Sequence, residues 1–217
     1  MNVARVGVLG GTFDPIHEGH LAAGRAAMAA LGLERMLVVP SHVPPHRPDS
    51  PRASGYHRLQ MAKLGVAEMP GWAVSDLELE RGGQSFTFDT LTNLRALEPA
   101  SQFFFITGAD AFAEVASWRR YPEVLELSHF VVIARTGTPF ETVLARLPEL
   151  GGRFIDCQAA GADACRHAPF PSIFLVQAAT PAVSSTDVRR RAAAGELLDG
   201  LVPDAVHRYI LAHHLYV

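Results

Sequence analysis

The sequence has little cysteine, little net charge and no long apolar run, and each shortage excludes a class of protein. Its 217 residues include two cysteines, Cys157 and Cys165, which flank a stretch of small residues and form no C-x-x-C pair. We therefore expect two free thiols in a reducing compartment, with a regulatory disulfide or a metal site as the alternatives. The 19 basic and 22 acidic residues give a net charge of −3. So mild an acidity leaves no chain-wide footprint for nucleic acid, and any anion site should be a local basic cluster.

Signals for membranes and export are also missing. No apolar run approaches the roughly 20 residues that a membrane-spanning helix needs. The opening stretch MNVARVGVLGG has too short an apolar core for a signal peptide and no cleavage pattern. These features predict a cytoplasmic protein with no membrane partner. The oligomeric state stays open, with a homo-oligomer as one alternative.

What the sequence does contain is an alternation of apolar strand-like runs and helix-like stretches. The strand-like runs are 5–10, 35–40, 72–80, 102–108, 129–135 and 172–177. The helix-like stretches are 20–32, 56–69, 87–98, 110–118, 141–147, 184–194 and 203–215. Apolar strands separated by helices predict an α/β fold, a doubly wound and mainly parallel sheet with helices on both faces.

One domain is expected over residues 1–217, with a core at 1–180 and short C-terminal helices at 181–217. The glycine- and alanine-rich region 151–171 is interpreted as loop with at most one edge strand. In such sheets ligands bind beyond the carboxyl ends of the strands. The loops 10–19, 40–55, 108–110 and 178–186 should therefore converge.

The stretch GGTFDPIHEGH, residues 10–20, stands where the first strand hands over to a helix. It matches neither the G-x-x-x-x-G-K-[ST] phosphate loop nor the G-x-G-x-x-G dinucleotide motif. Gly10 and Gly11 still allow the backbone to approach a ligand, and a helix beginning near His17 would offer its N–H groups to an anion. His17 and His20 share one helix face, and Gly19 between them carries no side chain that could block access. Phosphate contact is the favoured interpretation, with capping histidines and half of a zinc site as alternatives.

The stretch SSTDVRRR, residues 184–191, is the second candidate. Ser184 and Asp187 have the spacing of a capping box, in which the aspartate would reach back to the helix start. That does not explain the three arginines, because cations oppose the helix dipole near an N-terminus. They point in different directions, so one or two at most can face one site. Arg189 is predicted to bind phosphate, with a solvated basic face as the alternative.

Three further stretches allow a structural or a functional interpretation. In VPPHRPDS, the donors His46 and Arg47 follow the second strand, in what could be a plain surface loop. In FTFDTL, Thr87 and Asp89 could simply start a helix. In GADAFAEVASW, Trp118 could simply be core.

Taken together, the motifs make a resemblance specific. GGTFDPIHEGH and SSTDVRR resemble the G-x-F-D-x-x-H-x-G-H and S-S-T-x-[IV]-R signatures of the nucleotidyltransferase superfamily. VPPHRP, FTFDTL, GADAF…SW and VVIAR resemble the bacterial nicotinate-nucleotide adenylyltransferases, in the same order from about residue 5 to 215. Val183 stands where the family often has isoleucine, and Arg47 where it often has lysine.

The resemblance implies a Rossmann-like fold and a set of site residues. His17, His20 and Arg189 inherit the catalytic role of contacting ATP phosphates. The other residues implied to bind ATP are Gly10, Gly11, Thr12, Phe13, Gly19, Gly108, Asp110, Ser184, Ser185 and Thr186. The residues implied to bind nicotinate mononucleotide are His46, Arg47, Thr87, Trp118 and Arg135.

The implied reaction transfers AMP from ATP to nicotinate mononucleotide and releases pyrophosphate. The attacking phosphate monoester has a second pKa of about 6, so it needs no general base at neutral pH. Mg²⁺ would be held by ATP phosphates and water, with no dedicated protein ligands. The expected partners are the two substrates, without nucleic acid. The alternatives are a relative that uses nicotinamide mononucleotide or phosphopantetheine as acceptor, and a nucleotide-binding regulator that has lost turnover.

Overall fold

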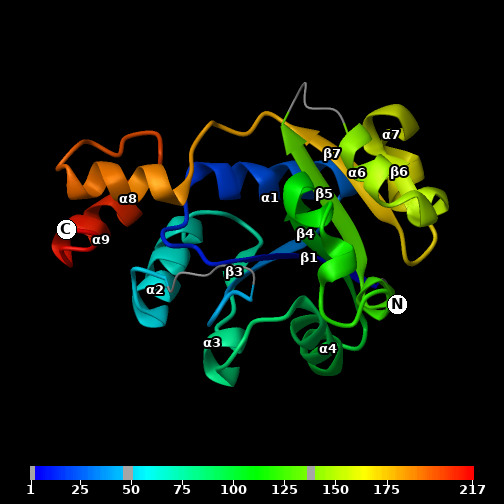
Figure 1. Ribbon diagram of the computed structural model, residues 1–217, viewed down its shortest axis with the longest axis horizontal. Coiled ribbons are helices and arrows are strands. Elements are labelled where there is room, and N and C mark those ends of the chain that lie inside the picture. Colours follow the sequence, from blue (N-terminus) through cyan, green and yellow to red (C-terminus); the bar gives the residue numbers. More distant parts are fainter. Residues whose placement is uncertain (1–2, 46–50, 136–139) are drawn as a thin grey trace. The chain divides into compact units, whose positions relative to one another are not determined.

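The computed structural model describes residues 3–45, 51–135 and 140–217, and within them the predicted parallel sheet is present. The described strands are β1 (Ala4–Gly11), β2 (Arg35–Pro40), β3 (Trp72–Val74), β4 (Ser101–Gly108), β5 (His129–Arg135), β6 (Phe154–Asp156) and β7 (Ile173–Ala178). Their order in the sheet is β3-β2-β1-β4-β5-β7-β6. Figure 1 labels all of these strands except β2. The pairings from β1 to β6 are parallel, as expected for apolar strands joined by helical crossovers.

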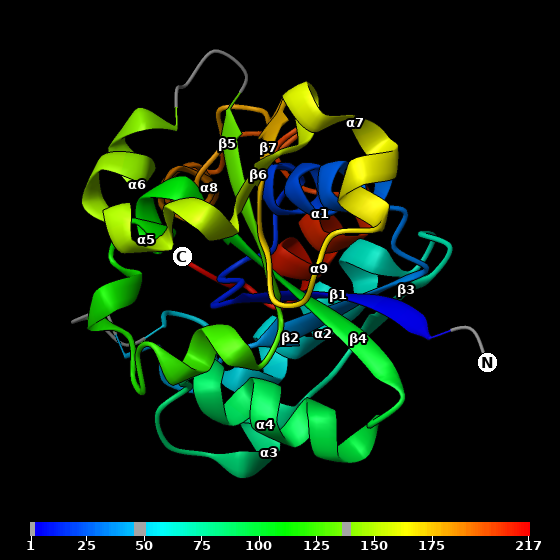
Figure 2. The ribbon, with the colours of Figure 1, turned by 90° about the vertical axis from the view of Figure 1, so that its right-hand side faces the viewer.

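The helices in the described residues follow the predicted alternation. They are α1 (Glu18–Leu31), α2 (Gly55–Val66), α3 (Leu77–Arg81), α4 (Thr87–Leu97), α5 (Ala109–Phe112), α6 (Glu141–Arg146), α7 (Cys157–Arg166), α8 (Ser185–Ala193) and α9 (Asp204–Ala212). Figure 2 shows α1 and α4 on opposite faces of β1 and β4, which confirms the doubly wound arrangement. No helix within the described ranges is long and apolar enough to cross a membrane.

Contacts divide the chain into two compact units. The first unit comprises residues 1–9, 23–36 and 86–179, and the second comprises 10–22, 37–85 and 180–217. Both β1 and β2 begin in the first unit and end in the second. The expectation of a single domain over 1–217 stays a prediction.

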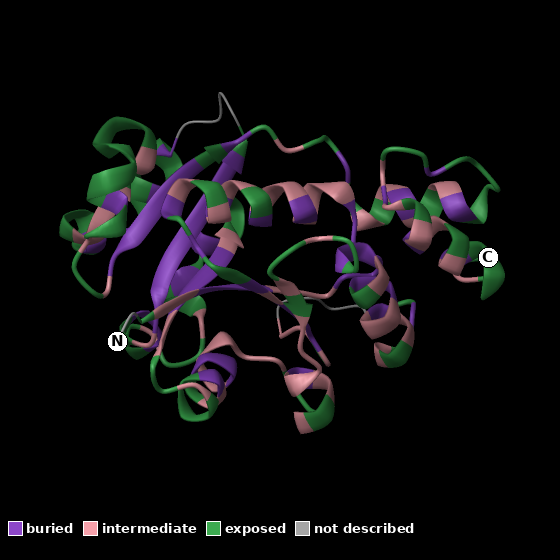
Figure 3. Cartoon of the chain, turned by 180° about the vertical axis from the view of Figure 1, so that it is seen from behind, coloured by how far each residue is buried: buried purple, intermediate pink, exposed green. Residues whose placement is uncertain are grey.

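The core of the first unit lies on β4, β5 and β7. Phe104, Phe130 and Phe174 are buried almost completely there, and the strands stand out as buried in Figure 3. Burying such a side chain stabilises a fold by roughly 1.5–3 kcal/mol, so these strands anchor the unit. The register pairs Gly108 with Ile133 and Arg135 with Ala178, which brings the carboxyl ends of the three strands to one edge.

Three segments differ from the sequence expectation. The strand predicted over 72–80 is wrong beyond Val74, because Leu77–Arg81 forms α3 and buries Glu78, which an alternating strand would expose. The helix predicted over 110–118 breaks after Phe112 and continues as a 3₁₀ turn, Val115–Ser117.

The third segment is 151–171, interpreted from sequence as loop with at most one edge strand, where the structure has the edge strand β6 and also the helix α7. Asp156 caps α7 by accepting from the N–H groups of Gln158 and Ala159. Gly161 interrupts the helix with φ 80°, so its small residues never build a continuous apolar stripe.

Candidate active site

The turn between β1 and α1 holds the two motif histidines against each other. The backbone N–H of His17 donates to Nδ1 of His20 over 3.2 Å, and that of His20 donates to Nδ1 of His17 over 3.3 Å. The two rings are stacked, with centroids 3.6 Å apart, and Phe13 meets the His20 ring edge-on at 5.0 Å. Since each Nδ1 accepts a hydrogen bond, each neutral ring carries its proton on Nε2. The predicted shared face is therefore present, and each ring carries its N–H on Nε2.

His17 is held in its neutral form. Only 7% of its surface is exposed, and this burial lowers its pKa from the usual 6.5 to about 4. At neutral pH it can donate a hydrogen bond without carrying a charge. The zinc alternative gains no support, because no cluster of three histidine, cysteine, aspartate or glutamate side chains was found in the described residues.

The glycines of this turn make room for rings. A Cβ on Gly11 would stand 3.0 Å from the Phe13 ring, and one on Gly19 would stand 3.1 Å from His17 and 3.2 Å from Val183. All three distances are shorter than ordinary van der Waals contact. Gly19 therefore clears space for the imidazole of His17 itself, which sharpens the expectation that it keeps the site open.

Helix α8 brings the second motif to the first. Ser185 Oγ donates to the carbonyl of Pro15 over 3.1 Å. Arg189 Nη1 donates to the carbonyl of Asp14 over 2.7 Å, and its Nη2 donates to Thr186 Oγ1 over 3.2 Å. The phosphate-binding stretches predicted from residues 10–20 and 184–191 are thus in direct contact. We call the group of His17, His20 and Arg189 the phosphate clamp, after the role that the sequence predicts for these residues.

The start of α8 confirms half of the predicted capping box. Ser184 accepts from the N–H of Asp187, but the Asp187 carboxylate accepts from Arg190 and Arg191. The expectation that Asp187 reaches back to the helix start gives way, because two guanidinium groups one turn ahead are stronger partners for a carboxylate. Pairing with Asp187 also removes these two arginines from the clamp, as the sequence predicted for adjacent positions.

Sequence reasoning missed Arg58, which binds the loops beside the clamp. It is 1% exposed, and its guanidinium donates to the carbonyls of Thr12 (2.7 Å), Ser41 (2.6 Å), His42 (3.3 Å) and Ala53 (3.3 Å). Burial lowers its pKa from the usual 12.5, so the carbonyl dipoles have to compensate the buried charge. A helical arginine gives no sequence signal for such a role.

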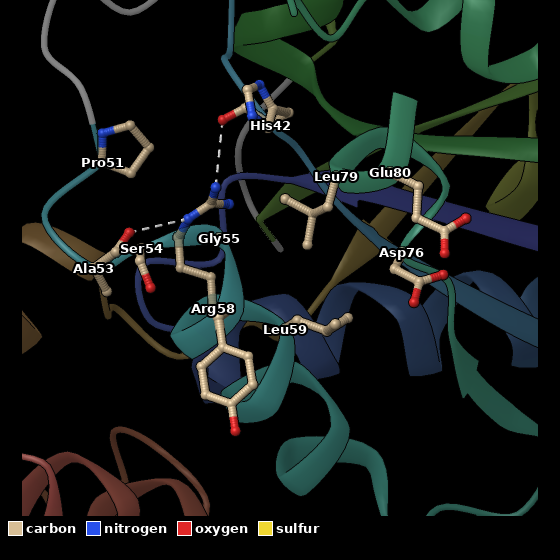
Figure 4. A pocket seen from close by; sticks show the side chains of 11 residues that line it. His42, Pro51, Ala53, Ser54, Gly55, Arg58, Leu59, Asp76, Leu79 and Glu80 are labelled. Carbon is tan, nitrogen blue, oxygen red and sulfur yellow. Dashed lines mark hydrogen bonds between the residues drawn. The ribbon is translucent and has the colours of Figure 1, made fainter. Parts of the chain in front are cut away.

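A cavity of about 460 Å³ adjoins Arg58 between the starts of α2 and α3. Its lining includes His42, Asp76 and Glu80 (Figure 4). The donors expected in this loop, His46 and Arg47, lie outside the described residues.

The remaining predicted residues belong to the first unit. Thr87 opens α4, and Trp118 packs edge-on against Phe105 with centroids 6.1 Å apart. The segment after Trp118 is joined to α4, because Arg119 forms an ion pair of 3.0 Å with Asp89. Two of the three stretches that looked ambiguous in sequence are thus tied together.

Gly108, Asp110 and Arg135 stand at the carboxyl edge of β4 and β5, and all three are exposed. The binding roles of these three residues and of Thr87 and Trp118 stay predictions.

Comparison with known proteins assigns the chain to a family. The cytidylyltransferase-like family model matches residues 8–191, which include both motifs of the clamp. Two curated relatives are each named "Probable nicotinate-nucleotide adenylyltransferase". One, from Symbiobacterium thermophilum, is 39% identical over 99% of this chain and 96% of its own length. The other, from Citrifermentans bemidjiense, is 36% identical over 98% of both. The chain belongs to the cytidylyltransferase-like nucleotidyltransferases and, among these, to the nicotinate-nucleotide adenylyltransferase family.

Solved structures agree on the fold. The nicotinic acid mononucleotide adenylyltransferase of Plasmodium falciparum, complexed with APC, superposes with a TM-score of 0.72 at 18% identity, covering 98% of this chain and 97% of that one. The same enzyme complexed with NaAD gives a TM-score of 0.71 at 19% identity, with the same coverage.

Proposed function

We propose that this protein transfers the AMP group of ATP to nicotinate mononucleotide, giving nicotinate adenine dinucleotide and pyrophosphate in NAD biosynthesis. The single observation that carries the proposal is the phosphate clamp, in a chain whose full-length relatives bear that enzyme's name. An oxygen of the mononucleotide phosphate would bond to the α-phosphorus of ATP while the bond from that phosphorus to the pyrophosphate oxygen breaks.

The clamp suits this reaction because negative charge builds on the α-phosphate and on the leaving pyrophosphate. The Nε2–H groups of His17 and His20 would donate to phosphate oxygens, and Arg189 would hold the β- and γ-phosphates. The acceptor phosphate is already ionised at neutral pH, so positioning takes the place of a general base.

A divalent cation belongs to the proposal as a companion of ATP. Mg²⁺ keeps several waters and is commonly carried by substrate phosphates, where it neutralises leaving-group charge. Among the described residues no cluster offers a ready cage of side chains. We propose that ATP oxygens and water hold the ion, because Mg²⁺ commonly binds through substrate phosphates and keeps several waters.

A pyrophosphate-release assay with ATP and an acceptor panel tests the proposal. Nicotinate mononucleotide should support turnover, with nicotinamide mononucleotide and phosphopantetheine far behind. His20→Ala should remain folded and lose most activity. The control His167→Ala, at an exposed histidine of α7's C-cap, should not change turnover.

The outcomes separate the alternatives. Turnover with phosphopantetheine alone would identify a relative with another acceptor. Tight ATP binding without pyrophosphate release for any acceptor would indicate a regulator instead.

A further inference from the structure

A tyrosine beyond α9 reaches into the phosphate-binding turn. The hydroxyl of Tyr216 donates to Oδ1 of Asp14 over 2.8 Å, and the Tyr216 hydroxyl oxygen also lies 3.9 Å from Sδ of Met61. Its backbone φ is 72°, which is uncommon for a bulky residue. We infer that the hydrogen bond to Asp14 helps to keep Tyr216 in this backbone conformation.

The acceptor of this hydrogen bond is a buried carboxylate. Asp14 is 4% exposed, and it also accepts from the backbone N–H of Arg52 over 2.7 Å and of Ala53 over 3.1 Å. Buried charges are costly unless hydrogen-bonded, so these three donors determine where Asp14 can stand. Burial and the neighbouring carboxylate raise the pKa of Tyr216, which keeps its hydroxyl protonated as a donor.

Asp14 in turn positions Arg189. Its carbonyl accepts from Arg189 Nη1 over 2.7 Å, and its carboxylate oxygen Oδ2 lies 3.8 Å from the same nitrogen. The Arg189 side chain is only 21% exposed, so it has little freedom to compensate a shift of residue 14.

We propose that Tyr216 is a positioning residue of the phosphate clamp: by holding Asp14 it sets where Arg189 meets the phosphates of ATP. The proposal rests on the proposed function, since it assigns Tyr216 to the nucleotide half of that site. Tyr216 touches no substrate in this account, and its effect passes through Asp14 and Arg189. Its removal should affect ATP and leave the acceptor almost untouched.

The matched pair Tyr216→Phe and Tyr209→Phe tests this. Each change deletes one hydroxyl near α9, and the hydroxyl of Tyr209 pairs with His57 Nδ1 at 2.9 Å instead of Asp14. Tyr216→Phe should raise the KM for ATP about ten-fold, the effect of losing a hydrogen bond to a charged group. The KM for nicotinate mononucleotide should change less than about two-fold, and Tyr209→Phe should leave both values unchanged. An unchanged KM for ATP in Tyr216→Phe would overturn the proposal.

A double-variant cycle then tests the route through Arg189. In an Arg189→Lys background, Tyr216→Phe should cost little more, because the group it positions is already altered. Full additivity of the two losses would overturn the proposal. Thermal unfolding checks that both single variants fold. If Tyr216→Phe does not, Tyr216→His, which keeps a ring with an N–H donor, is measured with the same expected direction.

Failure of the proposed function can be told apart from failure of the proposal for Tyr216. If the unaltered protein binds ATP but does not convert nicotinate mononucleotide, equilibrium titration with ATP replaces the KM. The same ten-fold weakening is then expected for Tyr216→Phe and not for Tyr209→Phe.

Discussion

Two histidines in different parts of the molecule share one electrostatic property and differ in their surroundings. His17, at the start of α1, and His129, at the start of β5, are 7% and 1% exposed. Burial is the main cause that lowers the pKa of each to about 4. By this property alone the two would be equal candidates for a functional site.

Their hydrogen bonds separate them. Both ring nitrogens of His129 are engaged within the first unit, with Nδ1 accepting from the N–H of Ser172 over 3.0 Å and Nε2 2.9 Å from the Gln102 amide. Its ring also stacks on Phe104. The hydrogen bond found for the ring of His17 within the described ranges uses Nδ1 and comes from its partner histidine. The lowered pKa therefore indicates only that each ring is buried. What distinguishes His17 as a candidate site residue is its Nε2 atom, for which no hydrogen bond is found in the described residues.

The largest expected effect separates the two by activity. His17→Asn keeps an acceptor near Nδ1 and deletes the Nε2–H donor, so it should lower kcat roughly 100-fold or more, as for other donors to transition-state charge. His129→Asn should leave the activity per folded molecule unchanged. Steady-state kinetics on both purified variants measures this, and equal losses in the two would refute the distinction.

The reverse order is expected for stability. His129→Asn breaks the ring stack on Phe104 and leaves polar partners in the core, which should lower the free energy of unfolding by about 2–3 kcal/mol. His17→Asn should cost less, because the amide oxygen can still accept the hydrogen bond from the His20 N–H. Urea unfolding of both variants gives the comparison, and a more stable His129→Asn protein would contradict it.

The pH dependence should be shared by both histidines. In the unfolded chain each has a pKa near 6.5, and in the folded protein about 4, so the unfolded state takes up protons first as the pH falls. Their contribution to stability is fully present above about pH 6.5 and is lost progressively toward pH 4. Urea midpoints between pH 7.5 and 4.5 measure the slope, which should be shallower in His129→Asn. An unchanged slope in that variant would contradict the assignment.

A smaller effect is expected at Gly19. A methyl group there would press on the His17 ring, so Gly19→Ala should lower kcat several-fold with little loss of stability. Gly151→Ala is the matched control, because a Cβ at Gly151 meets nothing within 4 Å. Equal kinetics in the two variants would show that the ring yields without cost.

The smallest effect concerns the two cysteines. As with His129, burial shifts the pKa of a side chain here, that of Cys157, which is not part of the clamp. Burial, together with the Cys165 thiol 3.0 Å away, raises the pKa of Cys157, so little thiolate exists at pH 7.5. Thiol-reactive dye should label the folded protein slowly and the urea-unfolded protein fast, without changing activity. Rapid labelling of folded protein would contradict this.

Much of the fold could be predicted because the central strands have apolar sequences, which indicate that they are buried. HFVVIAR and SIFLVQ are apolar throughout, and both form strands within a residue of the predicted bounds. The failures have local causes. Leu77–Arg81 alternates like a strand but turns into α3, and the small residues of α7 carry no periodic signal around the break at Gly161.

Candidate site residues could be proposed from sequence where the chemistry needs particular residue types, but not where a residue matters only through its position in the fold. The histidine pair and Arg189 stood out from their motifs, and the structure stacks the two histidines and joins Arg189 to Asp14 of the same turn. Arg58 and Tyr216 carried no such signal, because their partners come from distant segments and only folding brings these together.

The contacts of Arg58 have a consequence for mutational mapping of this enzyme. Every hydrogen-bond acceptor found for it in the described part of the chain is a main-chain carbonyl, from Thr12, Ser41, His42 and Ala53. Substituting any of those four side chains leaves its carbonyl in place, so the hydrogen bonds to Arg58 would survive a side-chain scan along the loops. The contribution of these hydrogen bonds would be measured by substituting Arg58 itself.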